Sequence, residues 1–278
     1  MQRRTFVRTL GAGLAGAVAA PEQLFAAARL DRIGLELYAV RAAMKADPDK
    51  TLAAIRAIGY TDVELLWSFK NFGQSNAQVK AALAREGLNA PSAHIAPELL
   101  LDANQWRRDV DAAKELGHQY LIVPSIPAET NASLDAWKKW ADHFNEAGRA
   151  ARAGGIWLAF HNEPDHMKPI AGEVPYDTFV KRLDPAAVRL QLDVGNMLVG
   201  GGDPMQYLAR YRDRYWSFHL KDVVADHSHD TELGTGVLTF LNSSRPFRIC
   251  RRSRATSSRK ARKTSSRARV RTLRFFAA

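Results

Sequence analysis

Apolar and polar residues follow two alternating periods along most of the chain. Seven short apolar runs, partly β-branched, are typical of strands in a sheet buried on both faces. These runs cover residues 32–40, 61–67, 88–95, 119–126, 156–161, 188–194 and 215–223. Segments with helical spacing lie between most of them, at residues 49–58, 78–86, 109–116 and 134–153. Glycines follow these helices, at the positions where a left-handed residue is expected: Gly59, Gly87, Gly117 and the pair Gly154-Gly155.

Repeated strand–helix units predict an α/β fold of the TIM (β/α)8 type. An open doubly wound sheet would show the same alternation, but no Gly-rich phosphate loop follows the first strand. The repeats amount to seven units, one fewer than a closed barrel needs. We therefore expect an incomplete barrel over residues 29–240, in which the eighth strand–helix unit is missing or replaced.

Residues 1–28 have the features of a twin-arginine export signal. Arg3 and Arg4 precede a weakly apolar stretch at residues 10–20 and a run of small residues ending at Ala28. We expect an exported, periplasmic protein, with a frayed amphipathic terminus as the alternative. No segment reaches the length and hydrophobicity of a membrane span.

The last 38 residues, 241–278, differ in composition from everything before them. They hold 13 Lys/Arg and no Asp/Glu, whereas residues 1–240 hold 27 Lys/Arg and 29 Asp/Glu. The net charge of +11 therefore belongs to this segment, and the expected barrel gives no sign of a specific nucleic-acid partner. The Ser/Arg bias of residues 241–278 predicts a disordered tail. The single cysteine, Cys250, excludes an intrachain disulfide.

Metal-ligand residues recur at the ends of three consecutive predicted strands. Glu163, Asp193 and His219 are spaced by 30 and 26 residues, about one strand–helix unit each. Side chains so placed meet at the C-terminal mouth of a barrel, and two carboxylates with an imidazole suit a divalent cation. Each residue also has a structural alternative. Asp193 could cap the next helix, Glu163 could be a loop carboxylate, and His219 could be a core histidine.

Other residues are candidates for the same mouth. His161 precedes Glu163 on its strand, and Lys221 shares the face of His219 because side chains alternate along a strand. His94 ends the third predicted strand, while Glu64 and Trp67 lie at the end of the second. His161 could also orient a ligand without touching the metal, and Trp67 could simply pack.

Several short motifs resemble one protein family when they are taken in order. They are Gly34–Arg41 (GLELYAVR), Ser92–Ile95 (SAHI), Phe160–Glu163 (FHNE), Leu192–Asn196 (LDVGN), Phe218–Val223 (FHLKDV) and Glu232–Gly236 (ELGTG). Together they resemble the exported sugar phosphate isomerase/epimerase family of the xylose isomerase-like TIM-barrel superfamily. The resemblance implies a divalent metal, Mn²⁺, Mg²⁺, Zn²⁺ or Co²⁺, held by Glu, Asp, His and Glu from strands five to eight.

Asp193 and His219 match the second and third of these ligands. The first position of the family pattern is Ala159 here, so Glu163 or His161 would take its place. The fourth ligand has no counterpart, because no acidic residue follows Glu232.

The resemblance implies isomerisation or epimerisation of a sugar or sugar phosphate by proton transfer next to a carbonyl, through an enediolate. In this hypothesis Glu163, His161 and Lys221 are catalytic, and a small-molecule carbohydrate contacts His94, Glu64, Trp67 and Asn196. A pseudoenzyme or carbohydrate-binding protein with an incomplete metal site is the alternative. An abasic-site endonuclease would need more histidines at the mouth. The sequence does not indicate the oligomeric state.

Overall fold

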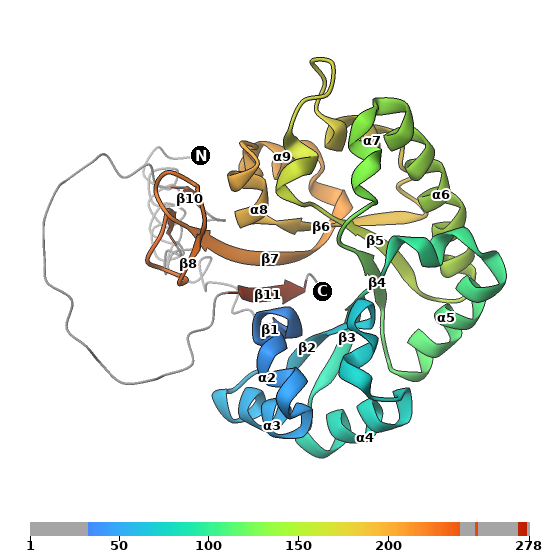
Figure 1. Ribbon diagram of the computed structural model, residues 1–278, viewed down its shortest axis with the longest axis vertical. Helices are drawn as coiled ribbons and strands as arrows, with labels where there is room; N and C mark the ends of the chain where they lie inside the picture. The colour runs from blue at the N-terminus through green and yellow to red at the C-terminus, as the bar shows by residue number, and fades with distance from the viewer. Residues whose placement is uncertain (1–32, 240–247, 250–271, 277–278) are drawn as a thin grey trace, which may run out of the picture.

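The computed structural model describes residues 33–239, 248–249 and 272–276. All seven predicted strands are present within these residues, and helices cover their outer side (Figure 1). The strands are β1 (Ile33–Glu36), β2 (Asp62–Leu66), β3 (Asn89–His94), β4 (Tyr120–Val123), β5 (Trp157–His161), β6 (Val188–Asp193) and β7 (Tyr215–Val223). The helices are α2 (Arg41–Ala46), α3 (Pro48–Ile58), α4 (Asn76–Glu86), α5 (Ala103–Glu115), α6 (Leu134–Ala153), α7 (Pro175–Arg182), α8 (Val194–Val199) and α9 (Pro204–Arg210).

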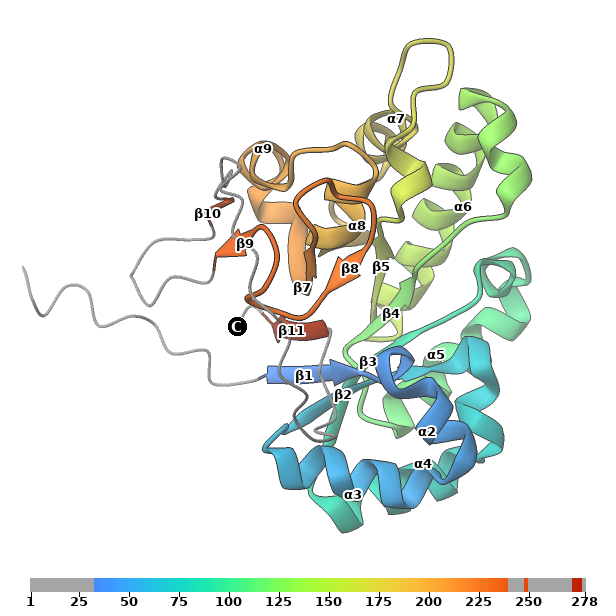
Figure 2. The same cartoon turned by 60° about the vertical axis from the view of Figure 1, so that its left-hand side comes forward.

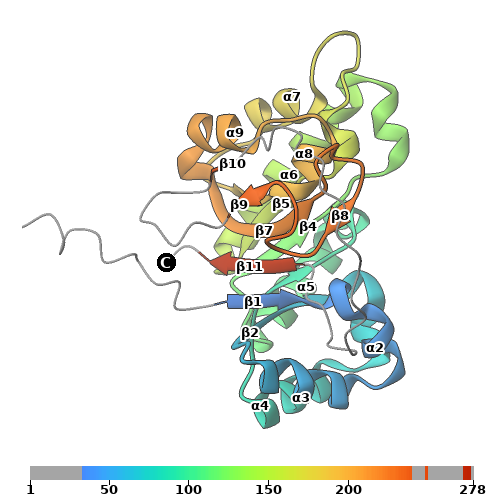
Figure 3. The same cartoon turned by 90° about the vertical axis from the view of Figure 1, so that its left-hand side faces the viewer.

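Strands β1 to β7 pair in chain order, and every one of these pairs is parallel. A further strand, β11 (Thr272–Phe276), lies between β1 and β7 and is antiparallel to both. Figure 2 and Figure 3 show β11 beside β1. The fold is thus the predicted TIM-barrel type, with its eighth strand–helix unit replaced by a single reversed strand.

Part of the segment expected to be disordered is therefore ordered in the structure. Within residues 241–278 the structure describes β10 (Arg248–Ile249), which pairs with β9 (Leu238–Thr239), and β11. A strand is stable between β1 and β7 because the facing edges of both would otherwise present unpaired backbone groups. The remaining residues of that segment, and the predicted export signal at residues 1–28, lie outside the described residues.

The first strand is shorter than its apolar run suggested. β1 ends at Glu36, and residues Leu37–Val40 form a 3₁₀ turn that leads into α2. This early end places Glu36 at the C-terminal tip of β1. Helix ends follow the predicted pattern, since Gly59 and Gly87 take positive φ angles of 114° and 62° after α3 and α4.

Aromatic side chains hold α6 and α7 against β5. Trp137, Phe144 and Phe179 contact Phe160 or one another with ring centroids 4.5–6.5 Å apart, mostly edge to face, and all four rings are fully buried. This packing fixes the strand that carries His161. Among the described residues, none of the helices has both the length and the apolar character needed to span a membrane.

Candidate functional site

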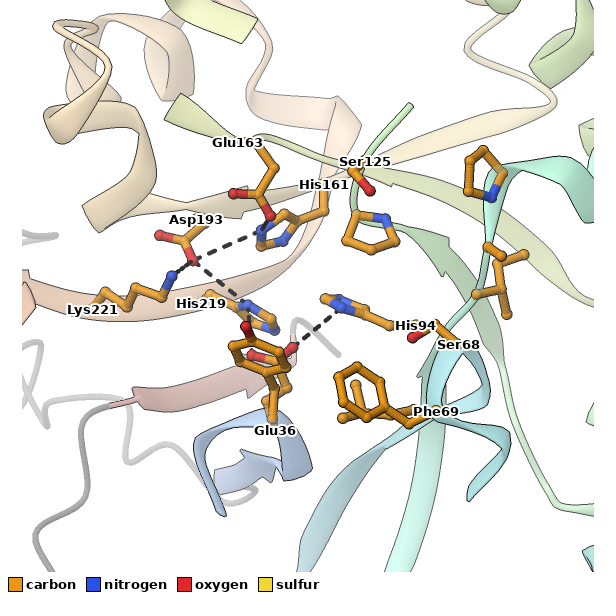
Figure 4. Close-up of a pocket in the computed structure, with 16 residues that line it drawn as sticks. Glu36, Ser68, Phe69, His94, Ser125, His161, Glu163, Asp193, His219 and Lys221 are labelled. Atoms are coloured by element: carbon orange, nitrogen blue, oxygen red, sulfur yellow. Dashed lines mark ion pairs between the residues drawn. The ribbon is translucent and has the colours of Figure 1, made fainter. Parts of the chain in front are cut away.

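A cavity of about 480 Å³ opens at the C-terminal ends of the strands. Its polar wall carries carboxylate, imidazole and ammonium groups that point toward one another from β1, β3, β5, β6 and β7 (Figure 4). These residues are Glu36, His94, His161, Glu163, Asp193, His219 and Lys221. The lining also includes the less polar residues Tyr38, Phe69, Pro97 and Pro124. A concave site with converging polar groups and an apolar side is typical of small-molecule binding.

A buried hydrogen-bond network lies beneath this wall and orients two of its histidines. The Glu64 carboxylate, fully buried, has one oxygen 2.8 Å from Nε2 of His219 and 3.1 Å from Nε2 of His94. Its other oxygen accepts from Ser92 at 2.9 Å and from Gln191 at 3.4 Å. Glu64 thus accepts a hydrogen bond from Nε2 of each imidazole, and both Nδ1 atoms face Glu36.

Gln191 connects the same network to His161. Its amide nitrogen donates to Glu64 and to Oγ of Ser217, the latter at 2.9 Å, which makes the amide oxygen the acceptor for the histidines. That oxygen lies 2.9 Å from Nδ1 of His161 and 3.0 Å from Nε2 of His94. His161 therefore carries its proton on Nδ1 and directs Nε2 toward Glu163 and Asp193, which lie 3.7 and 3.8 Å away.

The two carboxylate oxygens of Asp193 have different roles. Oδ1 accepts from the backbone N–H of Asn196 at 2.7 Å and so caps α8. Oδ2 is buried and has no hydrogen bond among the described residues, although it lies 3.7 Å from Nδ1 of His219 and 3.3 Å from Nζ of Lys221. Oδ1 thus forms the helix cap that was the structural alternative for Asp193, and Oδ2 faces the cavity.

Lys221, Asn196 and Glu163 form a chain at the rim of the cavity. Lys221 donates to Oδ1 of Asn196 at 2.8 Å, and Nδ2 of Asn196 donates to Glu163 at 2.8 Å. Gly195 allows this arrangement, because a Cβ there would collide with Cβ of Lys221 and lie 3.0 Å from its carbonyl oxygen. The glycine of the LDVGN motif thus lets the lysine pass close to α8.

Burial and neighbouring charges shift the pKa values of these groups in different directions. Burial raises the pKa of Glu163 to about 7, against the opposing effect of Lys221. For Asp193, burial favours the neutral acid, but Lys221, His219 and His161 outweigh it and hold the pKa below its ordinary value. Burial alone would lower the pKa of Lys221, but the charges of Asp193 and other carboxylates outweigh it and raise the pKa above its ordinary value, so the ammonium stays charged. The pKa of His161 falls well below its usual range because the ring is desolvated.

Most of the residues expected at the mouth do line the cavity. His94, His161, Glu163, Asp193, His219 and Lys221 all contribute to its wall. Asn196 adjoins that wall through Lys221 and Glu163, whereas Glu64 lies below it and contacts the histidines. The structure thus gives Glu64 an orienting position, where a contact with substrate was expected.

Trp67 lies away from the cavity, contrary to the sequence-based expectation. Side chains alternate along β2, so Glu64 and Leu66 face inward and residue 67 faces the other way. The Trp67 ring packs beside His118, with centroids 5.6 Å apart, and lines a separate shallow surface depression. This position makes Trp67 a packing residue.

Two residues of the site were not predicted from the sequence. Glu36 places Oε1 3.1 Å from Nδ1 of His94 and Oε2 3.5 Å from Nδ1 of His219. Gln191 lies beside His161 in the strand register and forms the network described above. Gln191 could have been found from inward-facing parity, since it precedes Asp193 by two residues on β6. Glu36 could not, because the apolar run does not show that β1 ends there.

The donor atoms at this mouth could hold a metal ion. Ligand atoms of Glu36, Glu64, His94 and His219 lie within 4.8 Å of one another, and so do those of His94, His161 and His219. Imidazole nitrogen and carboxylate oxygen together suit Mn²⁺, Zn²⁺ or Co²⁺. The buried Oδ2 of Asp193, which faces two imidazoles, is the kind of atom that a cation would satisfy.

Comparison with solved structures supports the same fold. A sugar phosphate isomerase/epimerase from Parabacteroides distasonis ATCC 8503 superposes with a TM-score of 0.65 at 25% identity, covering 74% of this chain and 81% of that one. An L-ribulose 3-epimerase has a TM-score of 0.54 at 16% identity, over 74% of this chain and 73% of that one, and shares the fold.

Curated relatives match in sequence. An inosose dehydratase of Geobacillus kaustophilus (strain HTA426) is 25% identical over an alignment of 198 residues, and the match covers 64% of this chain and 63% of that protein. An inosose dehydratase of Salmonella agona (strain SL483) is 35% identical over 94 residues, 34% of this chain and 30% of that protein. The chain thus spans less than two thirds of the length of these relatives. The family model described as xylose isomerase-like TIM barrel matches residues 52–247, more than half of the sequence, and the chain belongs to that family.

Proposed function

We propose that this protein is a metal-dependent isomerase or epimerase that moves a proton next to the carbonyl group of a small carbohydrate. The observation that carries the proposal is the convergence of Asp193, His219 and His161 at one cavity, where Oδ2 of Asp193 lies 3.7 Å from Nδ1 of His219 and 3.8 Å from Nε2 of His161. A bound divalent cation would polarise the carbonyl oxygen and the adjacent hydroxyl of the substrate. His219, Asp193 and either His161 or Glu163 would hold it.

Glu163 is placed to transfer the proton. Its side chain is 36% exposed at the cavity wall, and Asn196 holds one of its oxygens at 2.8 Å. A carboxylate so positioned can take a proton from a carbon and return it, the role of a general base and acid. Asn196 fixes the direction of the carboxylate, and the backbone N–H of Glu163 donates to Nδ1 of His166 at 3.0 Å.

Lys221 would stabilise the negative charge that develops when the proton leaves. Its ammonium lies 3.3 Å from Asp193 and has 20% of its side chain exposed at the cavity. A fixed cation near a developing oxyanion lowers the barrier because the charge needs no reorganisation during the reaction. His94, also on the wall, would donate or accept a hydrogen bond with a substrate hydroxyl.

A dehydratase is a second candidate, favoured by the identity with the inosose dehydratases. Elimination of water from a hydroxyketone also begins with loss of the proton beside the carbonyl. It differs in the second step, where a hydroxyl leaves the neighbouring carbon and the proton is not returned. The same Glu163, Lys221 and metal ligands serve both reactions up to that point.

Proton removal can be tested without knowing the final product. The purified protein, stripped of metal and then loaded with Mn²⁺, is incubated in D₂O with a panel of ketoses, ketose phosphates and a keto-inositol. NMR then follows deuterium entry at the carbon beside the carbonyl, new epimers and unsaturated products. We expect metal-dependent exchange that Asp193→Asn and His219→Ala abolish.

Asp135→Asn is the matched control, since its carboxylate is 88% exposed on α6. It should exchange deuterium at the rate of the unaltered protein. Exchange that persists in both site variants, or that is independent of metal, would refute the proposal.

A further inference from the structure

Glu36 has the position of a metal ligand, although its strand was not among those expected to supply one. It is the last residue of β1, and its side chain is 9% exposed at the cavity wall. Figure 4 shows its carboxylate directed at the imidazoles of His94 and His219. β11 separates β1 from β7, yet the carboxylate crosses that gap to lie 3.5 Å from Nδ1 of His219.

The position of the proton on His219 makes Nδ1 a ligand atom. Nε2 lies 2.8 Å from the fully buried Glu64 carboxylate, which can only accept, so the ring proton is on Nε2. Nδ1 then directs its lone pair toward Oε2 of Glu36 and Oδ2 of Asp193, at 3.5 and 3.7 Å. A carboxylate that orients a histidine in this way is the usual support of a histidine metal ligand.

Nδ1 of His219 thus lies within 3.7 Å of two carboxylate oxygens, one from Glu36 and one from Asp193. Both distances from Nδ1 exceed that of a good hydrogen bond. Ligands bound at about 2.1 Å in a roughly tetrahedral arrangement are about 3.4 Å apart, close to the two distances seen here. Oδ2 of Asp193 also suits a metal ligand, because it is completely buried and has no hydrogen bond among the described residues.

The charges at the site also fit a divalent cation. Glu36, Glu64, Glu163 and Asp193 supply four carboxylates around the cavity, and Lys221 is the one ammonium among the described residues of its wall. Buried charge of one sign is expensive unless a counter-ion neutralises it. Glu36 supplies a second carboxylate, besides that of Asp193, near Nδ1 of His219.

We propose that Glu36, together with Asp193 and His219, coordinates the divalent cation, and that Glu64 holds His219 in place from behind. This inference rests on the proposed function, since it assigns a ligand to the same metal. In this arrangement Glu163 is left at the rim, 3.7 Å from His161, for proton transfer. The first strand, rather than an eighth strand–helix unit, then completes the coordination.

Metal affinity tests the assignment directly. The metal-free protein, Glu36→Gln, Glu64→Gln and Asp193→Asn are titrated with Mn²⁺ and Co²⁺ by calorimetry, and circular dichroism checks that each variant is folded. We expect Glu36→Gln to lower the affinity at least 30-fold. Glu36→Asp keeps the charge on a shorter side chain, and its metal affinity should lie between those of the unaltered protein and Glu36→Gln. It replaces Glu36→Gln in the test if that variant does not fold. Glu115→Gln, an exposed change on α5, is the control and should bind as the unaltered protein does.

The visible spectrum of bound Co²⁺ separates a ligand from a residue that only positions one. Loss of a ligand should change the band positions and intensity in Glu36→Gln, whereas Glu64→Gln should keep the spectrum and bind more weakly. Equal affinity and an identical spectrum in Glu36→Gln would overturn the role of Glu36 while the metal site stands. Absence of binding in the unaltered protein would instead overturn the proposed function, and this inference with it.

Discussion

Asp222 fixes the loop that follows β7, and its removal should be costly. The carboxylate is fully buried and accepts four backbone N–H groups. Oδ1 accepts from Val223 at 3.0 Å and Leu238 at 2.9 Å, and Oδ2 accepts from Gly234 and Gly236, both at 2.9 Å. The Gly-Thr-Gly loop is thereby held against the strand that carries Lys221.

Asp222→Asn keeps the shape and one acceptor but turns an NH₂ group toward two N–H donors. An unpaired buried donor costs about 1–3 kcal/mol, so two of them give about 2–6 kcal/mol. The loop is partly exposed and can open to water, which limits the expected loss in the free energy of unfolding to about 3 kcal/mol. Equilibrium unfolding in urea measures the loss, and amide hydrogen exchange at Gly234, Gly236 and Leu238 locates it.

Asp226→Asn is the matched control from the same loop. Asp226 is exposed and accepts from the backbone and hydroxyl of Ser228, so its loss should cost less than about 1 kcal/mol. If Asp222→Asn costs no more than the control and the three amides keep their protection, the carboxylate does not hold the loop.

Three further predictions concern stability, positioning and location. Burial lowers the pKa of His118 to about 4, so the unfolded chain takes up this proton first as the pH falls below about 6.5. As the pH falls from 7 to 5, this group should therefore remove about 2 kcal/mol from the free energy of unfolding. Urea unfolding of His118→Gln at each pH should show a pH dependence that is weaker by this amount. Gly195→Ala should cost about 1–3 kcal/mol and move Lys221 away from Asn196, which thermal unfolding and a crystal structure would detect; an unmoved lysine would contradict the steric argument. Replacing Arg3 and Arg4 by lysine should retain the protein in the cytoplasm on cell fractionation, and unchanged periplasmic recovery would refute the export signal.

The sequence predicted those parts of the fold and site that depend on local pattern. Seven apolar runs became β1 to β7, and Asp193 and His219 meet because adjacent parallel strands place their ends together. Glu36 was missed because the apolar run continues four residues beyond the point where β1 ends. That end is set by the turn into α2, which periodicity does not reveal.

The strand β11 could not be predicted for a different reason. Its pairing joins residues 272–276 to β1 and β7, and nothing in a short basic segment specifies so distant a partner. The edges that it satisfies belong to other strands, so the cause of its structure lies outside its own sequence. The position of Trp67, by contrast, could have been predicted from the sequence, because the alternation of side chains along the strand places it outside the cavity.

The polar network under the cavity explains why a barrel of this kind tolerates polar groups in its interior. Glu64 and Gln191 are fully buried, and apolar side chains of similar size would avoid the cost of their desolvation. What apolar residues cannot provide is a fixed proton position on each imidazole. One carboxylate and one amide assign protons to Nε2 of His94, Nε2 of His219 and Nδ1 of His161, and so determine which nitrogen each ring presents to the cavity. The network thus gives up stability for a fixed orientation of three imidazoles at the cavity.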